Sequence, residues 1–143
     1  MLISQVLSKK GGEVFTVPEH HSVANLTQRL ADHNVGALLV VDDLGEVTGI
    51  VSERDVVRAM AHAPLVVTAK VSSIATRDVV YVTTDTTLDD VFALFTNNGF
   101  RHAPVTDPSG HLVGMISIRD VVAARMEELA SEKEALIEYI RQV

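Results

Sequence analysis

The chain has 143 residues, of which 47% are hydrophobic, and its formal net charge at neutral pH is −7. This length allows one domain, or two very small halves that share a core. The acidic balance argues against a protein that wraps nucleic acid, because neutralising phosphates needs a basic face, although a small anionic ligand needs only a local group of donors. Without cysteine, the chain has no disulfide and no thiol nucleophile.

The sequence contains no sign of a membrane segment or a secretion signal. No apolar run approaches the roughly 20 residues that a spanning helix needs. The N-terminus lacks the basic region and following apolar stretch of a signal peptide. We therefore expect a cytoplasmic protein that makes no contact with a membrane.

The first sixty residues predict a β-α-β-β-α unit. A short Val-rich run is followed by a helical pattern with the apolar face Val23, Leu26 and Leu30. Ser and Thr are good N-cap residues, and Asn tolerates the left-handed conformation that ends many helices. The expected elements are a strand at Val14–Val17, a helix from Ser22 to about Asn34, strands at Ala37–Val41 and Val47–Val51 around a tight turn, and a helix from Ser52.

The same unit returns after a connecting segment, Ala61–Ser73, in which Pro64 breaks the preceding helix. Its apolar helix face is predicted to be Leu88, Val91, Phe92 and Phe95. The expected elements are a strand at Val79–Val82, a helix from Thr87 to Gly99, strands at Ala103–Thr106 and Leu112–Ile116, and a helix from Ser117.

The two units are copies of one sequence, offset by 65 residues. Residues 14–60 (copy one) align with residues 79–125 (copy two) without a gap and share 12 identities over 47 positions. Several identities are Gly, Ser, Arg or Asp, which general hydrophobicity does not explain. An internal repeat of this kind indicates two structural copies.

The C-terminal stretch, residues 121–143, contains neither Gly nor Pro and predicts one long helix. Its seam residues recur at alternating spacings of four and three, as in a coiled coil. We expect this seam to pack either on the chain's own body or on a second subunit, and Lys133 argues against deep burial. The seam comprises Val122, Met126, Leu129, Lys133, Leu136, Ile140 and Val143.

These patterns predict an α/β (α+β) fold of two β-α-β-β-α repeats in a pseudo-twofold arrangement, plus a long C-terminal helix. A three-stranded sheet with helices on one side leaves its other face bare, so two copies would cover each other. The expected boundaries are repeat one at 1–62, a linker at 63–73, repeat two at 74–126 and the helical extension at 127–143.

Each copy ends in the motif Gly-x-x-Ser-x-Arg-Asp, which begins at Gly49 and at Gly114. Ser-x-x-Asp before an apolar run is typical of a helix capping box. The same residues also suit a ribose phosphate: the helix N-terminus and Arg favour phosphate, and Asp accepts hydrogen bonds from a cis-diol. An Asp committed to capping would not hold a ribose, so the two interpretations compete for the same oxygens.

A second polar cluster opens the middle strand of copy two. Arg101-His102-Ala103-Pro104 stands where copy one has Gly36-Ala37-Leu38-Leu39. A proline at a strand start predicts an edge or a bulge with free backbone. Arg101 and His102 are either additional phosphate donors or a solvated basic pair.

These residues closely resemble the tandem cystathionine-β-synthase-type (CBS) domain family, or Bateman module, over about residues 1–126. The resemblance rests on the duplicated Gly-x-x-Ser-x-Arg-Asp, the Arg-His-x-Pro-Val run and the segment Ile74-Ala75-Thr76-Arg77-Asp78, where the family usually has Met in place of Ala75. The chain looks like the stand-alone bacterial form. The resemblance implies a regulatory nucleotide sensor that pairs into a flat homodimer.

The resemblance also implies ligands of the adenosyl type: AMP first, and otherwise ADP, ATP, NAD(H) or S-adenosylmethionine. In copy two, Asp120 would hold the ribose, Ser117 the ribose or phosphate, and Arg119, Arg101 and His102 the phosphate. The adenine would lie between Val80-Tyr81-Val82 and Ala103-Pro104. The copy-one equivalents are Ser52, Arg54 and Asp55, with Phe15, Thr16, Val17, Gly36, Ala37 and Leu38 around the base. Copy one lacks the Arg-His pair, so it would bind fewer phosphates, bind more weakly or stay empty.

Other functions have weaker support in the sequence. His20, His21, His33 and His62 have no metal-ligand spacing, so we expect no metal site. The motif serines have no paired base, so we expect no enzyme and no catalytic cofactor. The alternative to a nucleotide sensor is an interaction scaffold in which both motifs only cap helices. The sequence identifies no effector protein.

Overall fold

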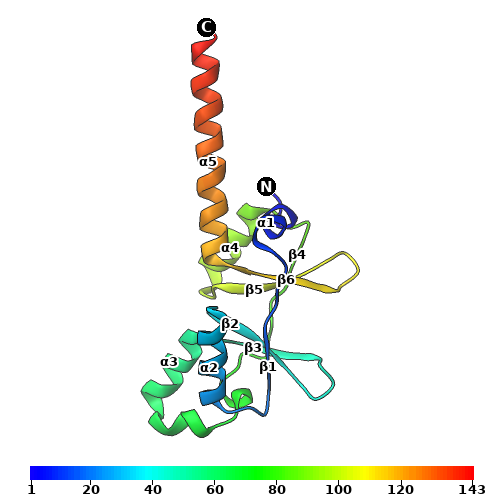
Figure 1. Ribbon diagram of the computed structural model, residues 1–143, viewed down its shortest axis with the longest axis vertical. Coiled ribbons are helices and arrows are strands. Elements are labelled where there is room, and N and C mark those ends of the chain that lie inside the picture. Colours follow the sequence, from blue (N-terminus) through cyan, green and yellow to red (C-terminus); the bar gives the residue numbers. More distant parts are fainter. The chain divides into compact units, whose positions relative to one another are not determined.

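The computed structural model describes all 143 residues and has mixed α/β structure, with two three-stranded sheets and a long C-terminal helix (Figure 1). The chain forms two compact units. The copy-one unit is Val14–Val80, and the copy-two unit combines Met1–Glu13 with Tyr81–Val143. The predicted fold class is therefore confirmed, and the N-terminal segment belongs to the unit that contains copy two.

The copy-one unit has the predicted element order. Its sheet has the strand order β1-β2-β3, in which β1 pairs parallel to β2 and β2 pairs antiparallel to β3. Four successive residues of β2 are buried, as expected of a strand covered on both faces. The elements are β1 (Thr16–Pro18), α2 (Val23–His33), β2 (Ala37–Val41), β3 (Val47–Ser52) and α3 (Glu53–His62).

The connecting segment after α3 is ordered and packs within the copy-one unit. It forms two short 3₁₀ helices, η1 (Pro64–Thr68) and η2 (Val71–Ser73). Val71 is fully buried in the same core as Leu26, Leu30 and Val56. Thr76 continues this contact through an antiparallel bridge to Ile50 of β3. The segment thus contributes to the core rather than only joining the copies.

The copy-two unit repeats the arrangement, with the strand order β4-β5-β6. Both main helices begin and end as predicted: Ser22 and Thr87 accept the N-cap hydrogen bonds, and Asn34 and Gly99 end the helices with positive φ. The elements are α1 (Ile3–Lys10), β4 (Val82–Thr83), α4 (Leu88–Asn98), β5 (His102–Thr106), β6 (Leu112–Ser117) and α5 (Ile118–Arg141).

Helix α1 is an element that the sequence interpretation left out. Its buried residues Ile3, Val6 and Leu7 lie in one core with α4, α5 and the strands of copy two. Its first turn is also tied to the loop before α4, because Ile3 N–H donates to Thr86 O at 2.9 Å. The helix thus completes the copy-two core from the other end of the sequence.

The predicted strand at Val79–Val82 is wrong in extent, because β4 contains only Val82 and Thr83. The predicted strand at Val14–Val17 also begins two residues too early, because β1 starts at Thr16, and proline explains the further shortening of β4. In copy one, Leu39 N–H donates to Phe15 O at 3.2 Å and extends the pairing with the first strand. Pro104 occupies the equivalent position and has no N–H to donate. The ladder therefore begins only at the pair Val82–Val105.

The expectation that Pro104 marks an edge strand or a bulge is also wrong. Pro104 lies in β5, the central strand, and pairs with Met115 of β6. The sheet irregularity follows one residue later, between Val105 and Thr106, and copy one has the same irregularity without a proline. A central proline is tolerated here because the short β4 makes no ladder bond at that position.

One predicted core residue is exposed. Phe92 shares the apolar helical pattern of α4 with Leu88, Val91 and Phe95, but only those three are buried, and Phe92 is 42% exposed. The buried face of α4 is therefore narrower than the four-residue apolar pattern predicts. Phe92 lies at the margin of that face.

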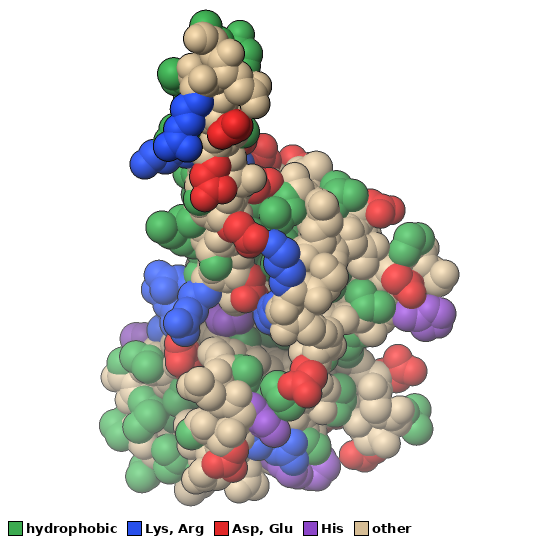
Figure 2. All heavy atoms as spheres, turned by 45° about the horizontal axis from the view of Figure 1, so that its top comes forward, with side chains coloured by type: hydrophobic (Ala, Val, Ile, Leu, Met, Phe, Trp, Pro, Cys, Tyr) green, Lys and Arg blue, Asp and Glu red, His purple; other side chains and the backbone are tan.

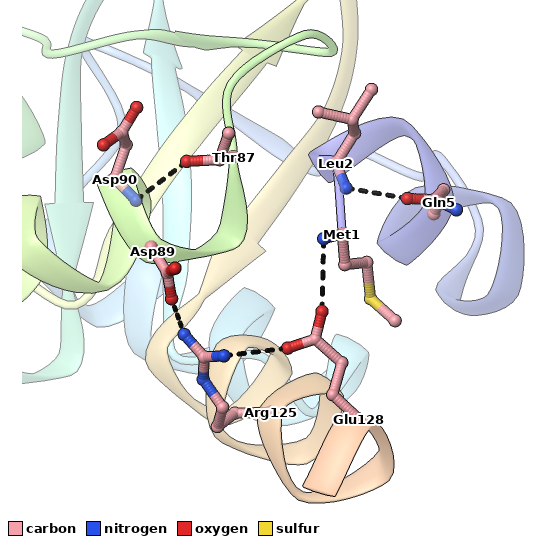
Figure 3. Close-up of polar contacts among 8 residues, drawn as sticks. All are labelled: Met1, Leu2, Gln5, Thr87, Asp89, Asp90, Arg125 and Glu128. Atoms are coloured by element: carbon pink, nitrogen blue, oxygen red, sulfur yellow. Dashed lines mark hydrogen bonds and ion pairs between the residues drawn. The ribbon is translucent and has the colours of Figure 1, made fainter. Parts of the chain in front are cut away.

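Helix α5 is anchored at its base by α1 and by the start of α4 (Figure 3). Glu128 accepts an ion pair from the N-terminal ammonium at 3.2 Å and another from Arg125 at 3.0 Å. Arg125 also pairs with Asp89 in the first turn of α4. The polar cluster thus holds the first three turns of α5 to its own unit.

The rest of α5 extends beyond α1 and α4 (Figure 1), and every residue from Leu129 onward is exposed. On the face drawn in Figure 2, hydrophobic, basic and acidic side chains all lie along this projecting part. The apolar seam residues are 44–92% exposed, so the copy-two unit does not cover them.

The packing of α1 generates a stability prediction. Ile3→Ala should lower the free energy of unfolding by about 2–5 kcal/mol, because it leaves a cavity in the copy-two core. Leu2→Ala, at a neighbouring residue that is 39% exposed, should change it little. Urea unfolding followed by circular dichroism measures both variants. Equal small effects would contradict the assignment of α1 to that core.

Candidate functional site

The repeated motif forms the same strand-to-helix junction in both units. Ser52 ends β3 and caps α3, and Ser117 ends β6 and caps α5. In each unit, the N–H of the third helical residue donates to the serine Oγ, at 3.3 Å for Asp55 and 3.2 Å for Asp120. The capping boxes predicted from the sequence are therefore present in both copies.

The two Asp side chains use only one oxygen for capping. Asp120 Oδ2 accepts from Ser117 N–H at 2.8 Å and from Ser117 Oγ at 2.9 Å. Asp55 Oδ2 makes the same contacts with Ser52, at 2.8 and 3.1 Å. The Oδ1 oxygens take no part in capping. Our expectation that capping and ribose binding compete for the same oxygens is thus wrong, because a carboxylate has enough acceptor capacity for both.

The helix N-termini offer fewer free N–H groups than a generic helix start. Ile118 N–H donates to Arg101 O at 2.9 Å, and Glu53 N–H donates to Gly36 O at the same distance. With the third N–H bound to serine, the N–H of Arg119 and that of Arg54 remain at the start of their helices. Phosphate binding here would depend mainly on side chains.

The Arg101–His102 pair lies beside the motif of copy two. His102 pairs with Ser117 across the β5–β6 ladder, and Arg101 O is held by the N-terminus of α5. Directly paired residues on adjacent strands share a face of the sheet. In copy one, Ala37 pairs with Ser52 in the same register. The structure thus brings Arg101, His102 and Ser117 together, and copy one has no cation at that position.

The residues predicted around the base of copy one lie in its unit, but several are core side chains. Val17 and Leu38 are fully buried, so neither residue is exposed to a ligand. Phe15 stacks on His33, with ring centroids 3.9 Å apart. Thr16 O already accepts a hydrogen bond from Arg29 Nη1 at 2.9 Å. The copy-one base region is therefore partly filled by its own side chains.

The corresponding residues of copy two are more open. Tyr81 is 43% exposed, and Leu94 stands at the position of Arg29. Val82, Ala103 and Pro104 are buried strand residues. Val80 is the last residue of the copy-one unit and is 42% exposed.

Lys10 is a site residue that the sequence interpretation missed. Its Nζ lies 2.6 Å from Asp120 Oδ2 and 2.6 Å from Met115 O. One signal was available: Ile3, Val6, Leu7 and Lys10 follow the i, i+3, i+4, i+7 spacing of one helix face. That spacing places Lys10 on the packed face of α1, although it does not reveal that this face meets Asp120.

Charge distinguishes the two copies more sharply than the shared motif does. In copy two, Lys10 pairs with Asp120, Arg119 precedes Asp120 in the motif, and Arg101 is joined to the start of α5 through its carbonyl oxygen. The copy-one motif has Arg54 between two carboxylates, Glu53 and Asp55. The first arrangement would favour a phosphate more than the second.

The structure supplies no alternative centre. No group of three or more His, Cys, Asp or Glu side chains is arranged to hold a metal ion. None of the helices has the length and apolar composition that crossing a membrane requires. Both motif serines are engaged with the adjacent Asp and with backbone N–H groups.

The sequence matches the CBS domain over residues 3–62 and again over 71–127. The chain belongs to the CBS domain family. A CBS-domain containing protein of Agrobacterium tumefaciens has a similar crystal structure, with 38% identity and a TM-score of 0.83, over 87% of this chain and 92% of that one. The resemblance on which the sequence interpretation relied is thus confirmed.

Two further CBS structures contain adenosyl ligands. A CBS domain protein of Pyrobaculum aerophilum, complexed with AMP, is 26% identical with a TM-score of 0.77, over 92% of this chain and 99% of that one. A CBS domain pair complexed with 5′-methylthioadenosine and S-adenosyl-L-methionine is 25% identical with a TM-score of 0.76, over 90% and 98%. CBS pairs of this fold thus bind adenosyl compounds.

Proposed function

We propose that this CBS pair is a regulatory sensor of adenosyl nucleotides and that copy two is its principal site. The observation that carries the proposal is Asp120, whose Oδ2 is used for capping while Oδ1 is left to accept from a ribose diol. Arg101, His102 and Arg119 would meet the phosphate and Ser117 the ribose or phosphate. Tyr81, Ala103 and Pro104 would line the base.

AMP is the ligand that this arrangement fits best. A 5′-monophosphate needs a few cations close to a diol acceptor, which describes the copy-two motif. The complex of the Pyrobaculum protein with AMP supports the same ligand class. ATP, NAD(H) and S-adenosylmethionine are the competing ligands. Binding would report cellular energy or redox state by shifting the packing of a dimer, without a catalytic step.

A scaffold that binds no ligand is the alternative function. The capping boxes favour it in part, because both Asp side chains would be retained for helix stability alone. The positive charges of copy two argue against it, since a helix cap does not require Arg101 or Lys10. Substitutions that separate capping from ligand binding distinguish the two functions.

Asp120→Asn provides this separation. The amide oxygen can accept both cap hydrogen bonds, whereas its NH₂ group presents donors where the diol needs an acceptor. We expect AMP at 100 times its Kd to stabilise the wild-type protein by about 2.7 kcal/mol. Asp120→Asn should keep a similar melting temperature without ligand and lose most of the AMP response in a thermal-shift assay.

Asp55→Asn is the matched control, because it makes the same change in the copy-one capping box. It should reduce the AMP response less than Asp120→Asn does. A folded wild-type protein that is not stabilised by AMP, ATP, NADH or S-adenosylmethionine would overturn the sensor and favour the scaffold.

We also propose that the seam of α5 pairs with a second copy of this chain. The seam has an exposed heptad pattern, and such a stripe is stable in water when a similar helix covers it. This pairing would extend the flat dimer that the family resemblance implies.

Replacing both Leu129 and Leu136 with Asp should convert a dimer to a monomer, because two charges enter the apolar seam. The control variant carries Ser131→Asp and Ala135→Asp, which add the same charge on exposed positions away from the seam. Size-exclusion chromatography with light scattering gives the mass of each. A monomeric wild type, or a seam variant that stays dimeric, would contradict this interface.

A further inference from the structure

Lys10 is held against the copy-two motif by the packing of α1. Leu7 lies so close to Gly114 of β6 that a Cβ at residue 114 would be 2.8 Å from Leu7 Cδ2. Gly11 then ends α1 with a φ of 97°. This close approach places the last turn of α1 along β6, where the Lys10 ammonium meets Met115 O and Asp120 Oδ2.

The Lys10–Asp120 pair is partly shielded from water. The side chains are 32% and 21% exposed, and the ammonium shares Oδ2 with both capping hydrogen bonds. Lys10 therefore neutralises the carboxylate that the proposed ribose contact would use. A ligand that brings only a diol meets an acceptor already weakened by an adjacent ammonium.

A ligand that also brings a phosphate changes this balance. Lys is a flexible cation with three donors, and phosphate is a stronger partner for it than a carboxylate that is already hydrogen-bonded. The ammonium would move from Asp120 Oδ2 to the phosphate, while the ribose hydroxyls donate to Oδ1. The phosphate then gives the ammonium a charged partner, which a bare nucleoside does not supply.

Copy one has no equivalent of this cation. Ala75 packs beside Gly49 in copy one as Leu7 packs beside Gly114 in copy two, so the residue that corresponds to Lys10, three positions later, is Asp78, which carries the opposite charge. The difference in charge between the two motifs thus comes from the segments that precede copy one and copy two in the sequence, and neither segment is part of the repeated motif.

We propose that Lys10 is a phosphate-binding residue of the copy-two site and that it sets a preference for phosphorylated over unphosphorylated adenosyl ligands. This inference rests on the nucleotide-binding function proposed above. The side chain that determines specificity would thus come from the N-terminal helix rather than from either repeated motif.

Isothermal titration with AMP and with adenosine tests the role of Lys10. Both ligands are titrated into wild type, Lys10→Met and Lys9→Met, and the affinity analysed is that of the site which Asp120→Asn abolishes. Lys10→Met should raise the Kd for AMP about tenfold or more, since a charge-assisted hydrogen bond is lost. The Kd for adenosine should stay unchanged or fall. The ratio of the adenosine Kd to the AMP Kd should therefore fall by about tenfold or more.

Lys9→Met is the matched control, because Lys9 pairs with Glu127 on the exposed side of α1 and α5. It removes the same charge and should leave both affinities within about twofold. Lys10→Arg should restore part of the AMP preference. An AMP-to-adenosine ratio unchanged by Lys10→Met would overturn the role of Lys10 alone, whereas a wild type that binds neither ligand would overturn the proposed AMP site as well.

Discussion

The hydrogen bonds between serine and aspartate at each strand-to-helix junction are the constraint on which the candidate sites depend. Ser117 presents its N–H and its Oγ to the same oxygen of Asp120, so the carboxylate cannot rotate freely. One oxygen completes the helix cap, and the other keeps a fixed direction. The same side chain can thus start the helix and offer a preorganised acceptor, and stability and ligand binding need not be alternatives.

The two copies share this constraint but differ in what surrounds it. The copy-two unit recruits α1, and α1 delivers a lysine to Asp120. Arg101 precedes its middle strand, His102 begins that strand, and Pro104 shortens the pairing with β4. Copy one keeps a longer first strand, an Arg29 bond to Thr16 O and a Phe15–His33 stack. One duplicated unit has therefore produced one cationic site and one more acidic, more filled site.

Much of this fold could be predicted from the sequence because its local signals agree with one another. The offset of 65, the caps at Ser22 and Thr87 and the turns between strands all identify the same unit. The failures have particular causes. A missing N–H at Pro104 shortened β4, Phe92 lay at the edge of a helix face, and α1 was overlooked although Ile3, Val6 and Leu7 have helical spacing.

The candidate site was less predictable than the fold. The motif identified Ser117, Arg119 and Asp120, and the strand alignment placed Arg101 and His102 beside them. Lys10 could not be assigned to the site, because its contact with Asp120 joins residues 110 positions apart in the sequence. The sequence spacing specifies only that a cap can form. That capping uses one carboxylate oxygen and leaves the other could be seen only from the atomic geometry.

The central claim is that copy two is the principal nucleotide site, and an NMR titration of the ¹⁵N-labelled protein with AMP tests it most directly. We expect the amide signals of Arg101, Arg119 and Asp120 to shift at lower AMP concentration than those of Gly36, Arg54 and Asp55. Shifts that begin in copy one, or no shift in either copy, would contradict the claim.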